Sequence, residues 1–198
     1  EDGIGGIKIK VGLPDSAEDL RRVSAVREHI GDAPLMVDAN QQWDRATALR
    51  MGQTLDELGL VWIEEPLDAY DVEGHARLTR TLDTPIATGE MLSSVAEHRA
   101  LIDARACDIV QPDAPRVGGI TQFMRLLTLA DEGYVRTPGV SNFKQHHLQM
   151  LFDEVLRHAH REHQIDGHAV ARTEVDRMRQ PEKRGARFAE GRAARVRD

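Results

Sequence analysis

Four carboxylates recur along the chain at nearly constant spacing and form its strongest chemical signal. Asp38, Glu64, Glu90 and Asp113 are separated by 26, 26 and 23 residues, and each follows a short apolar run. Acids that converge on one place repel one another unless a cation lies among them. Carboxylate oxygens are the ligands that hard divalent cations prefer. The spacing therefore predicts a divalent metal site, for which Asp38, Glu64 and Glu90 are the candidate ligands.

The same spacing predicts how the chain positions these acids. A strand, a helix and two loops occupy about 25 residues, so each interval fits one βα unit with an acid at the end of its strand. In an open doubly wound sheet, only the strands at the switch point share a site. In a closed barrel, the C-terminal ends of all the strands converge. We therefore predict an α/β fold, specifically a partial TIM-like (β/α) barrel.

Local patterns support alternating strands and helices over the first 132 residues. Residues 6–11 alternate between apolar and polar side chains, as a strand does. Ser16 with Asp19, and Ser94 with Glu97, have the spacing of helix capping boxes. The expected helices cover about residues 16–30, 44–58, 94–104 and 119–131.

Lys8 and Lys10 are two residues apart on the first predicted strand, so both side chains point to one face. Inside a barrel they need acids nearby, whereas on an edge strand they would be a solvated pair. Mutual repulsion is expected to lower the pKa of each ammonium, which suits a base near neutral pH. A lysine base beside a hard cation suits abstraction of a proton alpha to a carboxylate, with the metal stabilising an enediolate.

Composition excludes several other classes. The net charge of −7 argues against nucleic acid as a partner. The single cysteine, Cys107, excludes a disulfide framework and fits a reducing cytoplasm. No apolar run reaches the roughly 18 residues of a membrane span. The 198 residues suffice for one domain but fall short of the roughly 250 of a complete barrel.

The chain changes character near residue 133. Residues 1–132 hold 24 acidic and 13 basic side chains, whereas residues 133–198 hold 9 and 13. We predict a partial barrel domain over 1–132 and a divergent, partly helical or disordered tail over 133–198, with an amphipathic helix near 143–163. The chain starts at Glu1 without an initiator methionine, so a missing N-terminal portion is expected.

Five motifs together resemble a known family, the enolase superfamily in its mandelate racemase group, over about residues 5–132. They are Lys8-Ile-Lys10, Val37-Asp-Ala-Asn40, Trp62-Ile-Glu-Glu-Pro66, Thr88-Gly-Glu90 and Pro112-Asp-Ala-Pro-Arg-Val-Gly-Gly119. Their wording is most similar to acid-sugar dehydratases of the galactarate/L-talarate type. From the sequence we expect neither that family's N-terminal capping domain nor a recognisable C-terminal end of the barrel in these 198 residues.

The resemblance implies a role for each candidate residue. It implies Mg²⁺ as the cofactor, with the ligands Asp38, Glu64 and Glu90. Lys10 would be the base on one face of the substrate, and Lys8 would lower its pKa and neutralise the substrate carboxylate. Asn40 and Arg116 would contact the substrate.

The resemblance fails at one catalytic position. In the family, Asp113 would orient a histidine that acts on the opposite face of the substrate. The corresponding place in this chain is Gly139, and the nearest candidates, His146 and His147, come several residues later. The residue on the second face is therefore not identified.

Several functions remain open. The leading interpretation is a Mg²⁺-dependent hydro-lyase that dehydrates a hexarate-like acid sugar. The alternatives are a racemase or epimerase of the same superfamily, a truncated inactive metal-binding fragment, and a Schiff-base aldolase using Lys8 or Lys10. The resemblance is also compatible with a cytoplasmic homo-oligomer.

Overall fold

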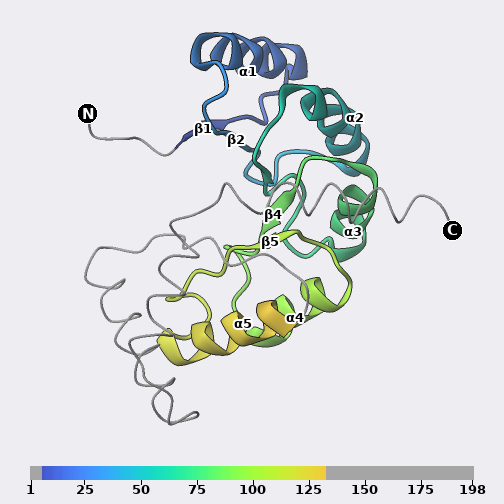
Figure 1. Ribbon diagram of the computed structural model, residues 1–198. Helices are drawn as coiled ribbons and strands as arrows, with labels where there is room; N and C mark the ends of the chain where they lie inside the picture. The colour runs from blue at the N-terminus through green and yellow to red at the C-terminus, as the bar shows by residue number, and fades with distance from the viewer. Residues whose placement is uncertain (1–5, 133–198) are drawn as a thin grey trace, which may run out of the picture. The chain divides into compact units, whose positions relative to one another are not determined.

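A computed structural model describes residues 6–132 of the chain, in which strands and helices alternate (Figure 1). The strands are β1 (Ile7–Lys10), β2 (Leu35–Asp38), β3 (Ile63–Glu64), β4 (Ile86–Thr88) and β5 (Ile109–Val110). The helices are α1 (Ser16–Ile30), α2 (Arg45–Leu55), α3 (Val72–Thr81), α4 (Val95–Asp103) and α5 (Ile120–Glu132), with the short 3-10 helix η1 (Asp56–Leu58) after α2.

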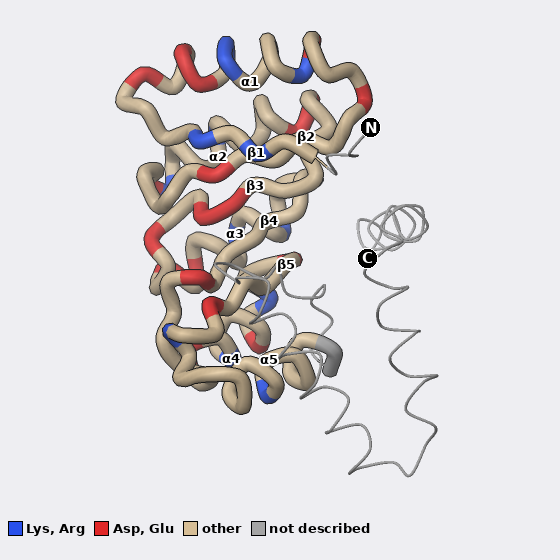
Figure 2. The backbone as a smooth tube through the Cα atoms, turned by 90° about the vertical axis from the view of Figure 1, so that its left-hand side faces the viewer, with Lys and Arg blue, Asp and Glu red and all other residues tan. Residues whose placement is uncertain are grey.

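The five strands form one parallel sheet in which neighbours in the chain are neighbours in space. Their order is β1-β2-β3-β4-β5, and Figure 2 shows them stacked in this sequence. Helix α2 packs on α3, α3 on α4, and α4 on α5. A doubly wound sheet would reverse direction at a switch point, and residues 6–132 contain no reversal. The predicted partial (β/α) barrel is therefore confirmed.

The strand register brings a lysine and two acids side by side at one end of the sheet. Lys10 is paired with Asp38, and Asp38 with Glu64, across the β1–β2 and β2–β3 ladders. Asp38 and Glu64 are the last residues of their strands, whereas Glu90 and Asp113 lie in the loops just beyond β4 and β5. Acidic segments follow one another along this end of the strands (Figure 2).

Two apolar clusters fix the helices against the sheet. The larger cluster joins β2 and β3 to the first three helices, with Leu35 of β2 and Leu55 of α2 fully buried. The smaller cluster joins β5 to α4 through Val110 and Leu101. Because these contacts set the helix positions, they also set the loops that carry the acids.

Two of the predicted helix starts are confirmed. Asp44 caps α2, and Ser94 forms the expected capping box with Glu97 at α4. Helix α2 ends at Leu55, and the 3-10 turn that follows carries the chain to Gly59 in a left-handed conformation. The predicted end near residue 58 therefore includes this turn.

The capping box predicted for Ser16 and Asp19 is wrong. Asp15 caps α1 instead, and Ser16 is the first helical residue. The Asp19 carboxylate is fully buried and accepts from the backbone N–H groups of Gly12 and Leu13 at 2.7 and 2.8 Å. Asp19 therefore secures the loop that follows the two lysines of β1.

Helix α3 did not emerge from the sequence patterns. Asp71 caps it by accepting from the backbone N–H of Gly74, which is a signal the sequence does contain.

The tail over 133–198, the helix near 143–163 and the histidines His146 and His147 lie outside the described residues. Among residues 6–132, every helix is too short or too polar to span a membrane.

Candidate active site

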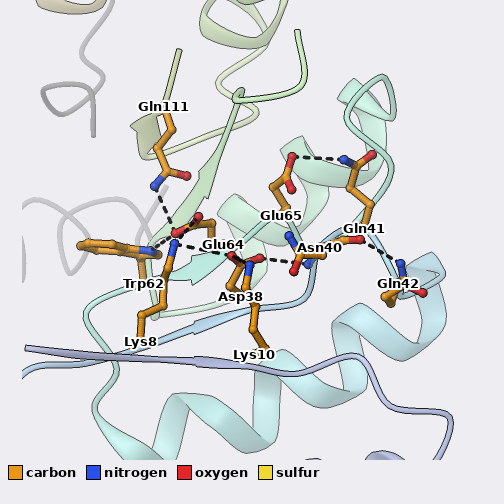
Figure 3. Close-up of polar contacts among 10 residues, drawn as sticks. All are labelled: Lys8, Lys10, Asp38, Asn40, Gln41, Gln42, Trp62, Glu64, Glu65 and Gln111. Atoms are coloured by element: carbon orange, nitrogen blue, oxygen red, sulfur yellow. Dashed lines mark hydrogen bonds and ion pairs between the residues drawn. The ribbon is translucent and has the colours of Figure 1, made fainter. Parts of the chain in front are cut away.

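Two lysines of β1 meet two of the strand-end acids (Figure 3). The Lys8 Nζ atom lies 2.6 Å from Glu64 Oε1 and 3.5 Å from Asp38 Oδ2. The Lys10 Nζ atom lies 2.6 Å from the same Asp38 oxygen. Both carboxylates are buried, whereas the Lys8 and Lys10 side chains are 38% and 63% exposed. The lysines thus share a face, as predicted, and acids compensate them there.

The pKa of Lys8 moves in the direction opposite to the one the sequence suggested. Burial lowers it, but the hydrogen bond to Glu64 and the negative charges of Glu64 and Asp38 together raise it above its ordinary value. The prediction that repulsion between the lysines lowers the pKa of Lys8 is therefore wrong, because its dominant charged neighbours are carboxylates. Lys8 keeps its charge in this arrangement.

The second oxygen of Glu64 is held by two neutral donors that the sequence analysis did not single out. The Trp62 indole Nε1–H donates to Glu64 Oε2 at 2.9 Å, and the Gln111 Nε2–H donates to the same oxygen at 3.2 Å. Trp62 lies two residues before Glu64, so strand alternation places both on one face. That periodicity could have identified Trp62, whereas the contact of Gln111 depends on tertiary structure.

The loop after β2 turns back onto the acids. The Asn40 backbone N–H donates to Asp38 Oδ1 at 3.0 Å. The Gln41 side chain bridges two later segments, donating to Glu65 Oε1 at 3.2 Å and accepting from the Ala69 N–H at 3.0 Å. Asn40 and Gln41 have φ values of 44° and 64°, in the left-handed region that asparagine tolerates better than most residues.

The Glu65 side chain lies among the other acids, although strand alternation predicts that it points away from Glu64. It follows the last residue of β3, adopts φ 40° and is buried. Burial raises the pKa of Glu65 to about 7, assisted by the negative charges of Glu90, Asp38 and Glu64 and opposed by a hydrogen bond from Asn40. The alternation rule fails because the strand has already ended. Glu65 thus adds a fourth carboxylate to the group formed by Asp38, Glu64 and Glu90.

Glu90 is placed by the turn between β4 and α4. The preceding Gly89 has φ 126°, which side-chain-bearing residues rarely adopt. The ring of His98, which is fully buried in α4, lies with Nε2 3.1 Å from the Gly89 carbonyl oxygen and Nδ1 2.8 Å from that of Ser94. His98 therefore ties this turn to its helix.

Asp113 and Arg116 lie together beyond β5. Asp113 is buried, and its Oδ1 accepts from the Arg116 backbone N–H at 3.0 Å. The Arg116 side chain is exposed. Gly139, the position at which a histidine partner for Asp113 was expected, lies outside the described residues.

The donor set of this site fits a hard divalent cation in charge and chemistry. Oxygen ligands suit Mg²⁺, and the four acids outnumber the two lysine ammoniums, which leaves two negative charges when all are ionised. The acids are Asp38, Glu64, Glu65 and Glu90. Within residues 6–132, no group of three or more acidic, histidine or cysteine side chains is arranged to hold a metal ion. Instead, the Lys8 ammonium bridges Glu64 and Asp38, and the Lys10 ammonium contacts Asp38.

Comparison with known families gives one match that covers most of the chain. The model described as "Enolase C-terminal domain-like" matches residues 1–185. This match extends beyond the residues that the five motifs cover.

Individual relatives agree with this match. The L-talarate/galactarate dehydratase of Salmonella typhimurium LT2 is 66% identical over 131 residues, which are 66% of this chain and 33% of that protein. The crystal structure of L-talarate dehydratase from Polaromonas sp. JS666 with Mg and L-glucarate is 61% identical with a TM-score of 0.70, covering 74% of this chain and 41% of that one. A racemase from Streptomyces coelicolor A3(2) with bound magnesium is 35% identical with a TM-score of 0.65, covering 70% and 44%. The chain therefore spans about a third of the curated dehydratase, at 33% of its length.

Proposed function

Because the chain belongs to the Enolase C-terminal domain-like family, we propose that it is a Mg²⁺-dependent acid-sugar dehydratase. The observation that carries this proposal is the pairing of Lys8 and Lys10 with Asp38 and Glu64 at the ends of adjoining strands. The identity of 66% to a talarate/galactarate dehydratase supports a hexarate as the substrate class.

The proposed reaction begins with loss of the substrate's α-proton. Lys10 would take this proton on its Nζ atom, since its exposed side chain can approach a substrate above the sheet. Lys8, which stays charged beside Glu64, would neutralise the substrate carboxylate. The β-hydroxyl would then leave as water after accepting a proton, and the resulting enol would tautomerise to a 2-keto-3-deoxy acid.

Asp38, Glu64 and Glu90 are the residues we propose as the Mg²⁺ ligands. When bound, Mg²⁺ would supply a Lewis acid that stabilises negative charge on the substrate's carboxylate oxygens. Asp38 Oδ2 is also the oxygen that contacts Lys10. A cation held by the Asp38 carboxylate would therefore act close to the Lys10 ammonium.

Three further residues complete the proposal. Asn40 and Arg116 would contact the hydroxyl and carboxylate groups of the substrate. Asp113, which is buried, would orient the acid that protonates the leaving hydroxyl. A racemase or epimerase would share the first step but return a proton to the same carbon, and the magnesium-bound racemase relative favours this alternative.

Turnover of galactarate tests the proposal. The 198-residue chain should form a 2-keto acid with Mg²⁺ and none with a chelator. Lys10→Arg keeps the positive charge beside Asp38 but cannot act as a base near neutral pH. It should lower the rate by roughly 10²–10⁴-fold, the usual contribution of a general base.

Two measurements separate the alternatives. Exchange of the α-proton in D₂O without keto-acid formation would favour the racemase or epimerase. Mg²⁺ should raise the unfolding temperature of wild type and Lys10→Arg but not of Glu64→Gln. A chain that responds to Mg²⁺ yet neither exchanges the proton nor forms product would contradict the enzymatic proposal and leave the metal-binding fragment.

A further inference from the structure

We propose that Trp62 and Gln111 are positioning residues that fix the Glu64 carboxylate and reserve its Oε1 atom for the metal ion. This inference rests on the proposed metal site. Its basis is that the two oxygens of Glu64 have different kinds of partner. Oε2 accepts from the Trp62 indole at 2.9 Å and the Gln111 amide at 3.2 Å, whereas Oε1 contacts only the Lys8 ammonium, at 2.6 Å, among the described residues (Figure 3).

The two neutral donors reach Glu64 from different parts of the sheet. Trp62 immediately precedes β3, the strand that ends at Glu64. Gln111 immediately follows β5, and strand β4 lies between β5 and β3. Contacts from two directions fix both the position and the rotation of a carboxylate, which a single hydrogen bond does not.

The two oxygens differ in which contacts can persist when a cation binds. Indole and amide N–H groups carry no net charge, so a cation at Oε1 would leave their bonds to Oε2 in place. The Lys8 ammonium would be repelled by the same cation, and its side chain, 38% exposed, has room to move toward solvent. Oε1 is thus the exchangeable oxygen, and one oxygen per carboxylate suits the octahedral geometry of Mg²⁺.

The orientation of Gln111 leaves one of its own atoms unsatisfied. Gln111 is 6% exposed, and its Oε1 atom is buried without a hydrogen-bond partner among the described residues. Turning the amide over would place this oxygen against Glu64 Oε2, so that two acceptors would face each other. A buried unsatisfied acceptor is unfavourable, and it is explained here by the donation from Nε2 to Glu64.

The second tryptophan of the chain provides an internal control. Trp43 is buried, at 6% exposure, whereas Trp62 is half-buried, and the Trp43 indole Nε1 has no hydrogen-bond partner among the described residues. A ¹⁵N-labelled chain therefore contains two indole N–H signals with different environments. We expect Mg²⁺ to shift the Trp62 signal and leave the Trp43 signal in place. Trp62→Phe and Trp43→Phe assign the two signals.

The affinity for Mn²⁺ tests the positioning role directly. Mn²⁺ accepts the same oxygen ligands as Mg²⁺, and its free concentration is measurable by electron paramagnetic resonance. Trp62→Phe and Gln111→Met should each weaken binding by about 10–100-fold, the usual effect of removing a partner that orients a metal ligand. Trp43→Phe removes a buried indole that donates to no described residue, and it should leave the affinity unchanged.

The outcomes separate this inference from the proposed function. A wild-type chain that fails to bind Mn²⁺ overturns the metal site itself and, with it, any role in positioning a ligand. If Trp62→Phe and Gln111→Met fold and bind Mn²⁺ as tightly as wild type does, the metal site stands. Only the positioning role of Trp62 and Gln111 is then overturned. If Trp62→Phe does not fold, the wild-type spectrum decides, because a Trp62 signal that Mg²⁺ leaves unmoved under saturating conditions contradicts the proposal.

Discussion

The first and second halves of the sheet hold their acids by different means. In the first half, β1–β3, Asp38 and Glu64 end their strands in register and contact lysine ammoniums. In the second half, β4 and β5, Glu90 and Asp113 lie in loops shaped by backbone contacts, such as that of His98 with Gly89. The proposed metal ligands come from both halves, so a bound cation would join a region already ordered by charge to one ordered by loop geometry.

The cores beneath the two halves differ as well. The cluster under the first half consists mainly of large aliphatic side chains. The cluster under the second half contains four alanines, and they are Ala69, Ala76, Ala106 and Ala130. Small residues let the helices approach the sheet closely but bury less apolar area per residue. The second half therefore depends more on its neighbours for stability.

The largest expected effects test whether the halves unfold together. Leu55→Ala in α2 and Leu101→Ala in α4 remove fully buried side chains from the first and second clusters. Each should lower the free energy of unfolding by about 2–5 kcal/mol, the usual cost of such a cavity. Both tryptophans lie in the first half, so fluorescence follows that half, while circular dichroism follows all the helices.

We expect the two signals to give one coincident transition for both variants, because the β3–β4 ladder joins the halves. Leu13→Ala, at a position 43% exposed, is the matched control and should change little. If Leu101→Ala shifts the dichroism transition and leaves the fluorescence transition where it was, the halves are separate cooperative units.

The next effect measures the link that a cation would make between the halves. Mg²⁺ at about 100 times its Kd should add roughly 2.7 kcal/mol to the free energy of unfolding. Glu64→Gln in the first half and Glu90→Gln in the second should each remove most of this gain. Calorimetry with and without Mg²⁺ provides the comparison. If Mg²⁺ stabilises Glu90→Gln as much as wild type, the ligands of the cation come from the first half alone.

Sequence patterns predicted the parts of this molecule that depend on periodicity. The spacing of Asp38 and Glu64 located two strand ends, and the alternation of Lys8 and Lys10 placed both side chains on one face. Patterns failed where a strand stops, since Glu65 no longer obeys alternation. They also missed contacts made across the sheet, such as that of Gln111 with Glu64, because nothing local in the sequence records which segment a folded side chain will meet.

Lys8→Met sharpens the contrast in charge. It removes the ammonium that bridges Glu64 and Asp38, so the repulsion between these two buried carboxylates is less compensated. Breaking a buried pair costs about 3–5 kcal/mol, but Lys8 is partly exposed, so we expect a loss of about 1–2 kcal/mol without metal. Mg²⁺ should reduce this deficit because it replaces the missing charge. Chemical denaturation with chelator and with Mg²⁺ measures both values, and an equal deficit in the two conditions would contradict the proposed overlap of ammonium and cation.

Ser94→Ala examines the loop-ordered half. Ser94 caps α4 just after the turn that carries Glu90, and its side chain accepts from the Glu97 backbone N–H. Loss of such a cap costs about 1 kcal/mol. We expect this loss in thermal unfolding both with and without Mg²⁺, since the Ser94 hydroxyl that is removed carries no charge. A larger loss with Mg²⁺ present would show that the cap also helps to place Glu90.

The smallest net effect is expected for the wild type as a function of pH, measured without metal between pH 5 and 7, because the two halves contribute with opposite sign. In the first half, burial and neighbouring acids raise the pKa of Glu65 to about 7. The folded chain therefore keeps a proton that the unfolded chain has released, and acidification through this range stabilises the fold. In the second half, burial lowers the pKa of His98, although its contacts with carbonyl oxygens oppose the shift. The unfolded chain then takes up a proton first, and acidification destabilises the fold.

Single substitutions separate these two opposing contributions. Glu65→Gln removes the stabilising one, so urea denaturation should show a steeper loss of stability as the pH falls from 7 to 5. His98→Gln removes the destabilising one without introducing a titrating group, so the same series should show a shallower loss than wild type. Parallel pH profiles for wild type and both variants would mean that neither buried group changes its protonation on unfolding. Opposite changes in slope would establish that the first half (β1–β3) and the second half (β4 and β5) respond to protons in opposite directions.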